Sequence, residues 1–334
     1  MPLPTIVADP AEVQPPHPGS TWPTVGPVSE TILVGEADDA RLSDFRRLND
    51  QAARRKLEGD EFFLSEGWVS IDRLLDSGHV FRSVLLSPSR VNRFRPFMER
   101  PELAGVPVYV AERDVMGDIV GFDLPRAVLV SAVRKPLWSV EQLAAASKRL
   151  IVLEALNDDE NVGAIARAAR AFDIDGMVLS PTCADPYHRR TVRVSMGEIL
   201  HMRVARASAD GWPGALDTLH SHEFETWAMT PDPKAEDLWG ADVPDRLAIM
   251  LGAEGPGLTR AVLDIACLRV RIPISGAVDS LNVGHAAAIA FAAVSRPRQK
   301  LLRSGSAGGG RSTGWNPAPA ARRSRCRRLG RPPP

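Results

Sequence analysis

Two successive segments establish the fold class, LIVLEAL at residues 150–156 and NVGAIARAARAF at residues 161–172. The first segment is a continuous apolar run, which is typical of a strand buried on both faces of a parallel sheet. The second has the 3.6-residue spacing of a helix. The same succession continues, with strands expected at residues 176–179, 225–229, 247–251 and 268–274 and helices at residues 258–267 and 286–294. Residues 150–295 are therefore expected to form an α/β module with a mostly parallel sheet, called here the C-terminal module.

Upstream of this module, residues 31–145 also alternate between helical and strand patterns. Helices are expected at residues 41–56 and 69–75, and strands at residues 80–86, 106–110 and 126–133. This alternation predicts a smaller α/β domain of roughly 110 residues, called here the N-terminal module, joined through a connecting helix at residues 136–149. Residues 1–30 hold eight prolines and residues 296–334 form a basic tail. Both ends are expected to be disordered.

Composition limits what the protein can be. The chain has 334 residues, of which 44% are hydrophobic and 25% charged, as in ordinary globular proteins. The formal net charge is zero, but residues 151–294 carry 12 basic and 20 acidic side chains, and residues 295–334 carry 11 basic and no acidic ones. This balance excludes a globally basic nucleic-acid binder, so a polyanion site must be a local patch or lie in the tail.

Several classes of protein are disfavoured by what the sequence lacks. No apolar run approaches the roughly 20 residues that a membrane span needs, and the N-terminus has no signal-peptide pattern. Three cysteines cannot all pair, and none has C-x-x-C spacing. We therefore expect no membrane segment, no metal site and a reducing, cytoplasmic compartment.

The first segment that could carry chemistry begins at Asn161 and includes Gly163 and Arg167. If the helix starts at Asn161, the side chains of Asn161 and Arg167 could both face one cleft, nearly two turns apart. Gly163 would let the backbone approach a ligand or another helix closely. The alternative is an ordinary helix with Asn161 as its N-cap and Arg167 as a solvated charge.

Two further segments follow in the same module. Residues 249–258, IMLGAEGPGL, predict a strand, a glycine-rich turn with free backbone N–H groups, and a helix start. The turn lacks the P-loop lysine and the G-x-G-x-x-G spacing, so a plain connecting turn is an open alternative. Residues 271–274, RIPI, place Pro273 inside an expected strand, which indicates an edge or an interrupted ladder. In VDSLNV, at residues 278–283, Ser280 and Asn282 are suited to begin a helix.

Taken together and in this order, the patterns N-x-G-x-x-x-R, G-x-E-G-x-G-L and I-P-I…S-L-N-V resemble the three motifs of the SpoU (TrmH-like) RNA 2′-O-ribose methyltransferases of the SPOUT class. The resemblance covers about residues 150–294. The N-terminal module looks like the L30e-like substrate-binding domain often fused upstream. The resemblance implies a SPOUT-type α/β fold with a deep trefoil knot. Periodicity alone would not predict it, because knots are nearly absent from proteins.

The resemblance also implies a cofactor, partners and site residues. The methyl donor would be S-adenosylmethionine, and the subunits would pair as homodimers whose active sites are completed across the interface. The substrate would be a ribose 2′-hydroxyl of structured RNA, with ribosomal RNA favoured over transfer RNA by the upstream module. Cofactor contacts would fall on Gly252, Ile272, Leu281 and the adjacent Leu251. The polar motif positions, taken as catalytic, are Asn161, Arg167, Glu254, Ser280 and Asn282.

The role of Arg167 can be narrowed by physical argument. The family proposal makes this arginine the base that removes the hydroxyl proton. Keeping an arginine neutral at pH 7 costs roughly 7.5 kcal/mol, however. We therefore expect Arg167 mainly to hold the phosphate-ribose and stabilise the developing alkoxide, passing the proton on only as methyl transfer proceeds.

Two clusters of basic residues leave alternatives open. The stretch 188–190, Arg193 and the stretch 201–203 could contact phosphates or form a solvated or interface surface. A similar cluster in the N-terminal module comprises Arg90, Arg93, Arg95 and Arg100.

Two other functions compete with methyl transfer. One is a non-catalytic RNA-binding ribosome assembly factor on the same scaffold, which the intact motif residues argue against. The other is a dinucleotide-binding oxidoreductase, which the missing G-x-G-x-x-G disfavours.

Overall fold

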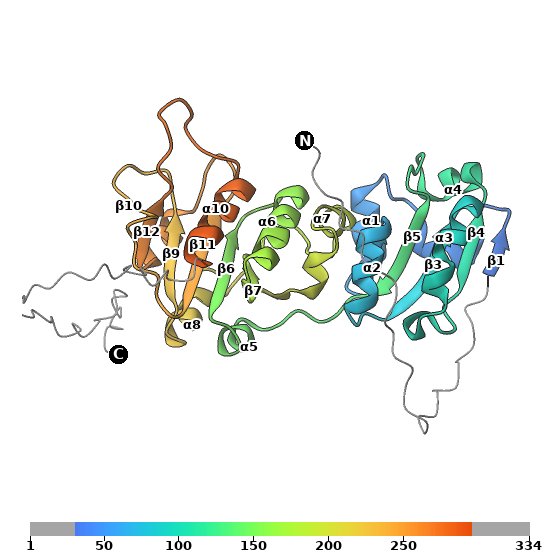
Figure 1. Ribbon diagram of the computed structural model, residues 1–334, viewed down its shortest axis with the longest axis horizontal. Coiled ribbons are helices and arrows are strands. Elements are labelled where there is room, and N and C mark those ends of the chain that lie inside the picture. The colour runs from blue at the N-terminus through green and yellow to red at the C-terminus, as the bar shows by residue number, and fades with distance from the viewer. Residues whose placement is uncertain (1–30, 296–334) are drawn as a thin grey trace, which may run out of the picture.

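The computed structural model describes residues 31–295, so the two termini that were expected to be disordered lie outside the described residues. Figure 1 shows two α/β halves side by side along the long axis, each a sheet flanked by helices. Within residues 31–295, no helix is long and apolar enough to cross a membrane. The same residues include no group of three or more His, Cys, Asp or Glu that could hold a metal ion.

The sheet of the N-terminal module has five strands in the order β1-β4-β3-β5-β2. β5 runs antiparallel to its neighbours β3 and β2, whereas the other pairs are parallel. The strands are β1 (Thr31–Val34), β2 (Phe62–Glu66), β3 (Phe81–Leu86), β4 (Val108–Ala111) and β5 (Val128–Val133). The helices are η1 (Ala40–Phe45), α1 (Gln51–Glu58), α2 (Trp68–Asp76), α3 (Pro88–Met98), η2 (Pro101–Leu103) and α4 (Arg113–Val120).

The sheet of the C-terminal module has seven strands in the order β10-β12-β9-β11-β6-β7-β8, and its paired strands all run parallel. This arrangement confirms the expected α/β class with a mostly parallel sheet, and the trefoil knot stays a prediction. The strands are β6 (Arg149–Glu154), β7 (Gly176–Leu179), β8 (Arg203–Arg206), β9 (Glu225–Met229), β10 (Glu236–Asp237), β11 (Leu247–Gly252) and β12 (Leu268–Arg271). The helices are α5 (Val140–Ala145), α6 (Asp159–Ala171), α7 (Arg189–Val194), η3 (Glu198–His201), α8 (Ala215–Ser221), α9 (Arg260–Ile265) and α10 (Val283–Ser295).

Three expectations about local structure were wrong in detail. The helix expected at residues 41–56 is two helices, η1 and α1, because Arg47 has a positive φ of 58° that no continuous helix allows. The connecting helix expected at residues 136–149 is only α5, whose start is set by a capping box between Ser139 and Gln142. Pro273 lies outside the ladder, since β12 ends at Arg271.

The two modules share one hydrophobic core. A single cluster of buried side chains includes Phe63 and Ile71 of the N-terminal module together with Ile151 and Val192 of the C-terminal module. The two modules approach closely where α2 meets the turn before η3. A Cβ atom at Gly197 would lie only 2.9 Å from the Cβ of Arg73. The modules are therefore packed against each other over a common apolar surface.

A buried carboxylate reinforces this contact. Glu66, at the end of β2, has a side chain only 4% exposed. It accepts a hydrogen bond from Arg189 and another, of 2.6 Å, from Arg193, both on α7. For these two arginines the interface interpretation is therefore correct. Nearby, Glu198 joins Arg73 of α2 to Arg170 of α6.

We expect Glu66→Gln to lower the free energy of unfolding by about 2 kcal/mol, because both guanidinium groups lose their counter-charge. Burial raises the pKa of Glu66, but Arg189 and Arg193 outweigh it and hold the pKa below its ordinary value of 4.5. A carboxylate with a lowered pKa stabilises the fold above its unfolded-state pKa, and this contribution is lost as pH falls through the folded-state pKa. Thermal unfolding from pH 7 to pH 3 should therefore show a steeper acid loss in the wild type than in the variant. The exposed Glu99→Gln is the control, and equal acid slopes in wild type and Glu66→Gln would contradict the assignment.

Candidate functional site

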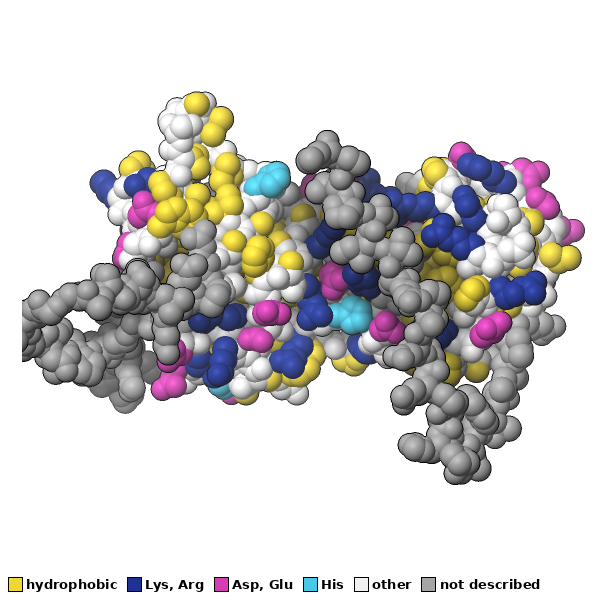
Figure 2. Space-filling view, viewed as in Figure 1, with side chains coloured by type: hydrophobic (Ala, Val, Ile, Leu, Met, Phe, Trp, Pro, Cys, Tyr) yellow, Lys and Arg dark blue, Asp and Glu magenta, His cyan; other side chains and the backbone are white. Residues whose placement is uncertain are grey.

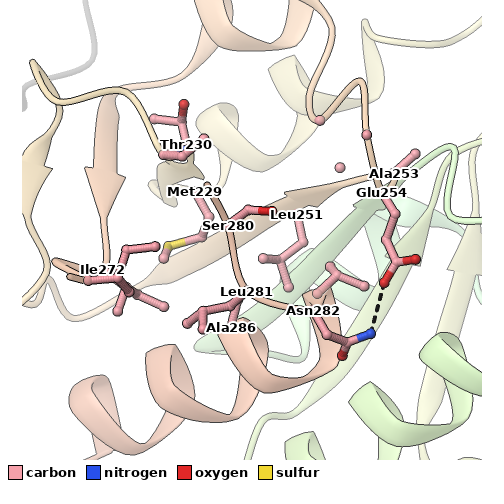
Figure 3. Close-up of a pocket in the computed structure, with 16 residues that line it drawn as sticks. Met229, Thr230, Leu251, Ala253, Glu254, Ile272, Ser280, Leu281, Asn282 and Ala286 are labelled. Carbon is pink, nitrogen blue, oxygen red and sulfur yellow. Dashed lines mark hydrogen bonds between the residues drawn. The ribbon is translucent and has the colours of Figure 1, made fainter. Parts of the chain in front are cut away.

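A cavity of about 440 Å³ within the described residues opens at the carboxyl ends of β9, β11 and β12. Parallel α/β sheets place ligand sites at this edge. The cavity is bounded by the ends of these strands, the glycine-rich turn, the loop before α10 and the start of α10 (Figure 3). Its lining comprises Met229, Thr230, Pro231, Leu251, Gly252, Ala253, Glu254, Gly255, Gly257, Ile272, Ile274, Ser280, Leu281, Asn282, Val283 and Ala286.

Most of the residues expected from the sequence surround this cavity. All four positions expected to contact the cofactor line it, namely Leu251, Gly252, Ile272 and Leu281. Three of the five polar positions also line it, namely Glu254, Ser280 and Asn282. Asn161 and Arg167 do not. Residues from the stretches 249–258 and 271–283 thus form much of the cavity lining. The helix segment that begins at Asn161 lies beside the cavity.

One amide side chain joins the three segments. The Nδ2 group of Asn282 donates to Oδ1 of Asn161 at 2.9 Å and to Oε1 of Glu254 at 2.8 Å (Figure 3 shows the second bond). Its own Oδ1 accepts hydrogen bonds from the backbone N–H groups of Gly284 and His285. These two bonds cap the first turn of α10. Asn282 is therefore both a helix cap and the centre of a polar network at the cavity rim.

Gly252 has a structural reason to be glycine. A Cβ placed there would lie 2.2 Å from the carbonyl carbon of Gly257 and 2.3 Å from the backbone nitrogen of Leu258. The turn folds back on itself, and the backbone N–H of Gly257 donates to the carbonyl of Ala253 at 2.9 Å. A side chain at Gly252 would therefore displace the turn itself, whether or not a ligand is present. Gly252→Val would therefore disturb the turn and would not test ligand space alone.

Helix α6 begins earlier than either interpretation of the segment at Asn161 assumed. The N-cap is Asp158, whose carboxylate accepts from the backbone N–H groups of Glu160 and Asn161. Residues six apart on a helix lie roughly 120° from each other. Asn161 thus faces Asn282, whereas Arg167 is exposed and lies outside the cavity lining. Among residues 31–295, no hydrogen bond or ion pair holds the Arg167 side chain. Within one subunit, Asn161 and Arg167 do not face a common cleft.

Gly163 serves close helix packing. A Cβ there would lie 2.8 Å from the carbonyl oxygen of Thr191 on α7. Glycine therefore lets α6, which carries Asn161, lie directly against α7, which is tied to the N-terminal module through Glu66.

Glu154 was not singled out by sequence reasoning, although it ends the apolar run that forms β6. Its side chain is 3% exposed and accepts three hydrogen bonds, from the backbone N–H and hydroxyl of Thr259 at 2.7 and 2.8 Å and from Nε1 of Trp212 at 3.0 Å. Thr259 is the N-cap of α9, directly after the glycine-rich turn. An acidic residue at the end of a buried strand is the sequence signal that could have identified this anchor.

We expect Glu154→Gln to lower the free energy of unfolding by about 1–3 kcal/mol. A glutamine has one acceptor oxygen, so either orientation of its amide directs an N–H₂ group at a donor, Thr259 or Trp212. Thermal unfolding measures the effect, with the exposed Glu223→Gln as control. If Glu154→Gln unfolds at the wild-type temperature, the carboxylate does not anchor the turn.

Comparisons with known proteins place these features in a family. Residues 148–292 match the SpoU rRNA Methylase family. An uncharacterized tRNA/rRNA methyltransferase of Mycobacterium bovis is 42% identical over 264 residues, which cover 77% of this chain and 89% of that protein. The 23S rRNA (guanosine(2553)-2′-O)-methyltransferase RlmP of Bacillus subtilis is 24% identical over 258 residues, covering 77% of this chain and 96% of RlmP.

Two solved structures have the same fold. The AdoMet-bound rRNA methyltransferase from Sinorhizobium meliloti superimposes with a TM-score of 0.66 at 23% identity, covering 79% of this chain and 97% of that one. The SpoU methyltransferase AviRb from Streptomyces viridochromogenes, in complex with the cofactor AdoMet, gives a TM-score of 0.65 at 19% identity, covering 77% and 98%. Each likeness spans both modules, since the coverage exceeds the length of either one.

Proposed function

The chain belongs to the SpoU rRNA methylase family, and from this membership we propose that it transfers a methyl group from S-adenosylmethionine to a ribose 2′-hydroxyl of structured RNA, with ribosomal RNA favoured over transfer RNA. The observation that carries the proposal is the Asn282 network, which joins all three motif segments at the rim of one cavity. All five polar motif residues are present in the chain, which also argues against a purely RNA-binding assembly factor.

The cavity suits the donor in size and chemistry. Its volume of about 440 Å³ lies within the range of small-molecule sites. Leu251, Ile272 and Leu281 supply apolar walls, and the turn from Gly252 supplies backbone groups for polar contacts. Among residues 31–295, Glu254 is the only charged side chain in the lining and is negative, which suits a cationic ligand. When bound, S-adenosylmethionine supplies an electrophilic methyl group on a positively charged sulfur.

The chain's own residues would orient the acceptor and handle one proton. Glu254, Asn282 and Asn161 are already fixed by hydrogen bonds, so they can hold a ribose without further ordering. Ser280, exposed on the same loop as Asn282, adds a hydroxyl to the cavity lining. We assign the stabilisation of the developing alkoxide and the binding of its phosphate to Arg167.

Arg167 can take this role if the protein is a homodimer. Its side chain is exposed, lies outside the cavity lining of its own subunit and is free of ion pairs within residues 31–295. Figure 2 shows hydrophobic side chains gathered over the region of α10, and half-buried apolar residues such as Ile289 and Ala293 lie on that helix. We propose that this apolar surface pairs two subunits and that Arg167 of each enters the site of the other.

The identity of the substrate is supported by the relatives' names. RlmP acts on 23S rRNA at a ribose 2′-oxygen, and the Sinorhizobium meliloti protein is an rRNA methyltransferase. Mapping 2′-O-methyl groups on total RNA from strains with and without the gene tests the proposal. One lost position in rRNA is expected. An unchanged map, together with no S-adenosylmethionine binding by calorimetry, would favour the assembly-factor alternative.

A further inference from the structure

A second cavity of about 270 Å³ lies where the two modules meet. One wall is the turn before β3, with Ser77 and His79, and another is the segment that leads into β8, with His201 and Arg203. The linker at residues 135–138 also lines the cavity, and Figure 1 shows this linker running from β5 to α5 between the two halves. We call this cavity the junction hollow.

The junction hollow is separate from the proposed donor cavity. Arg203 and Val204, which line the hollow, begin β8, so the hollow lies at the amino end of this strand. The donor cavity lies at the carboxyl ends of the same sheet. The nucleotide that accepts the methyl group cannot occupy both, and an occupant of the hollow needs an explanation of its own.

The lining combines aromatic and cationic side chains. Trp138 and Leu137 are adjacent on the linker and are 38% and 37% exposed. The guanidinium of Arg203 lies 5.4 Å from the centre of the Trp138 ring. The ammonium of Lys135 donates to the carbonyl of Ser77 at 2.5 Å, which leaves two of its three N–H groups for a ligand. Within the described residues, no Asp or Glu lines the hollow.

A neutral histidine completes the wall. The hydroxyl of Ser77 donates its one proton to the carbonyl of Leu74, so it accepts from Nδ1 of His79. The other ring nitrogen, Nε2, is then an acceptor beside the hydroxyl of Tyr187, 3.4 Å away. Burial, together with the nearby Lys135 and His201, lowers the pKa of His79 to about 4, so the ring is uncharged at neutral pH. The hollow thus offers cationic donors and one neutral acceptor.

We propose that the junction hollow binds one nucleotide, with its base against Trp138 and its phosphate held by Lys135 and Arg203. The planar base of a nucleotide can stack on the aromatic ring, and its phosphate can pair with the two cationic side chains. The volume is just below the usual range for small-molecule sites, which suits one nucleotide and not two. The nucleotide could be an unpaired residue of the RNA substrate or a free nucleoside monophosphate.

The first test measures the affinity of the full chain for 5′-AMP and for 5′-UMP. Calorimetry and tryptophan fluorescence both report this affinity. Trp138→Ala is expected to weaken nucleotide binding at least about fivefold, the lower bound for loss of one stacked base. Lys135→Met and Arg203→Met should weaken it as well. Trp239→Ala is the matched control, because Trp239 is also exposed, at 61%, but lies outside both cavities. S-adenosylmethionine affinity should stay unchanged in all four variants.

A second measurement distinguishes the two sources of the nucleotide. If the occupant belongs to RNA, Trp138→Ala weakens binding of an rRNA fragment, and 5′-UMP or 5′-AMP competes with that fragment. If it is a free nucleotide, RNA affinity is unaffected, and nucleotide binding persists at saturating RNA. The proposal is overturned if neither monophosphate binds and RNA affinity is unchanged in Trp138→Ala. If the wild type does not bind S-adenosylmethionine, the proposed methyl transfer is contradicted, and the nucleotide proposal is not affected.

Discussion

Arg167→Ala is expected to slow methyl transfer at least about 100-fold, while affinity for S-adenosylmethionine stays within a few-fold of wild type. The guanidinium would contact the phosphate and the oxygen on which negative charge develops, and the donor cavity contains no part of it. Single-turnover methylation over a range of pH measures the effect. Arg167→Lys should recover little, since an ammonium lacks the planar fork that binds a phosphate through two N–H groups.

The same helix provides the control. Arg170 is also exposed on α6, but it pairs with Glu198 at 3.5 Å, so Arg170→Ala should change the rate only a few-fold. Near-normal turnover in Arg167→Ala would contradict a catalytic role. A rate that titrates near neutral pH in the wild type and not in the variant would instead favour Arg167 as the base.

Ala286→Phe is expected to weaken S-adenosylmethionine binding at least about 100-fold. Ala286 lies on α10 and lines the donor cavity beside Leu281 (Figure 3), so a benzyl group there would occupy space that the donor needs. This variant is a cleaner probe than Gly252→Val, because Gly252 is packed against its own turn. Calorimetry measures the affinity, and Ala261→Phe, at an exposed position of α9 outside the cavity, is the control.

Unchanged affinity in Ala286→Phe would remove the donor from this cavity. The same variant also tests the placement of Arg167. If Arg167 acts in the partner's site, random mixtures of Arg167→Ala and Ala286→Phe subunits should recover roughly a quarter of wild-type activity, since half of the dimers then contain one intact site. No recovery is expected if Arg167 acts in its own subunit.

Local patterns predicted the C-terminal module well. The strands at Gly176–Leu179 and Glu225–Met229 have the predicted bounds. Both are short buried strands ended by turn residues, where apolar runs carry a clear signal. The helices α7 and α8 were missed because six or seven residues are too few to show helical periodicity. β8 was missed because arginines at both of its ends hide its buried centre.

The residues around the proposed donor cavity were predicted from motifs and not from geometry. Seven of the nine expected residues line it, because glycine, proline and small polar residues mark sharp turns at the carboxyl ends of strands. Arg167 was placed less well, because residues six apart on a helix lie roughly 120° from each other. Asn161 and Arg167 are both inside α6 and therefore face different sides of it.

Local sequence patterns were sufficient to predict the alternation of strands and helices, the parallel class of the second sheet and the three motif segments. These features depend on periodicity and turn chemistry, which act over a few residues. No local pattern could predict that Asn282 bonds to Asn161, 121 residues away, or that Glu66 binds arginines more than 120 residues later. Such contacts depend on strand order and on how the modules pack. Burial then makes each contact strong, because a buried polar group without a partner is costly.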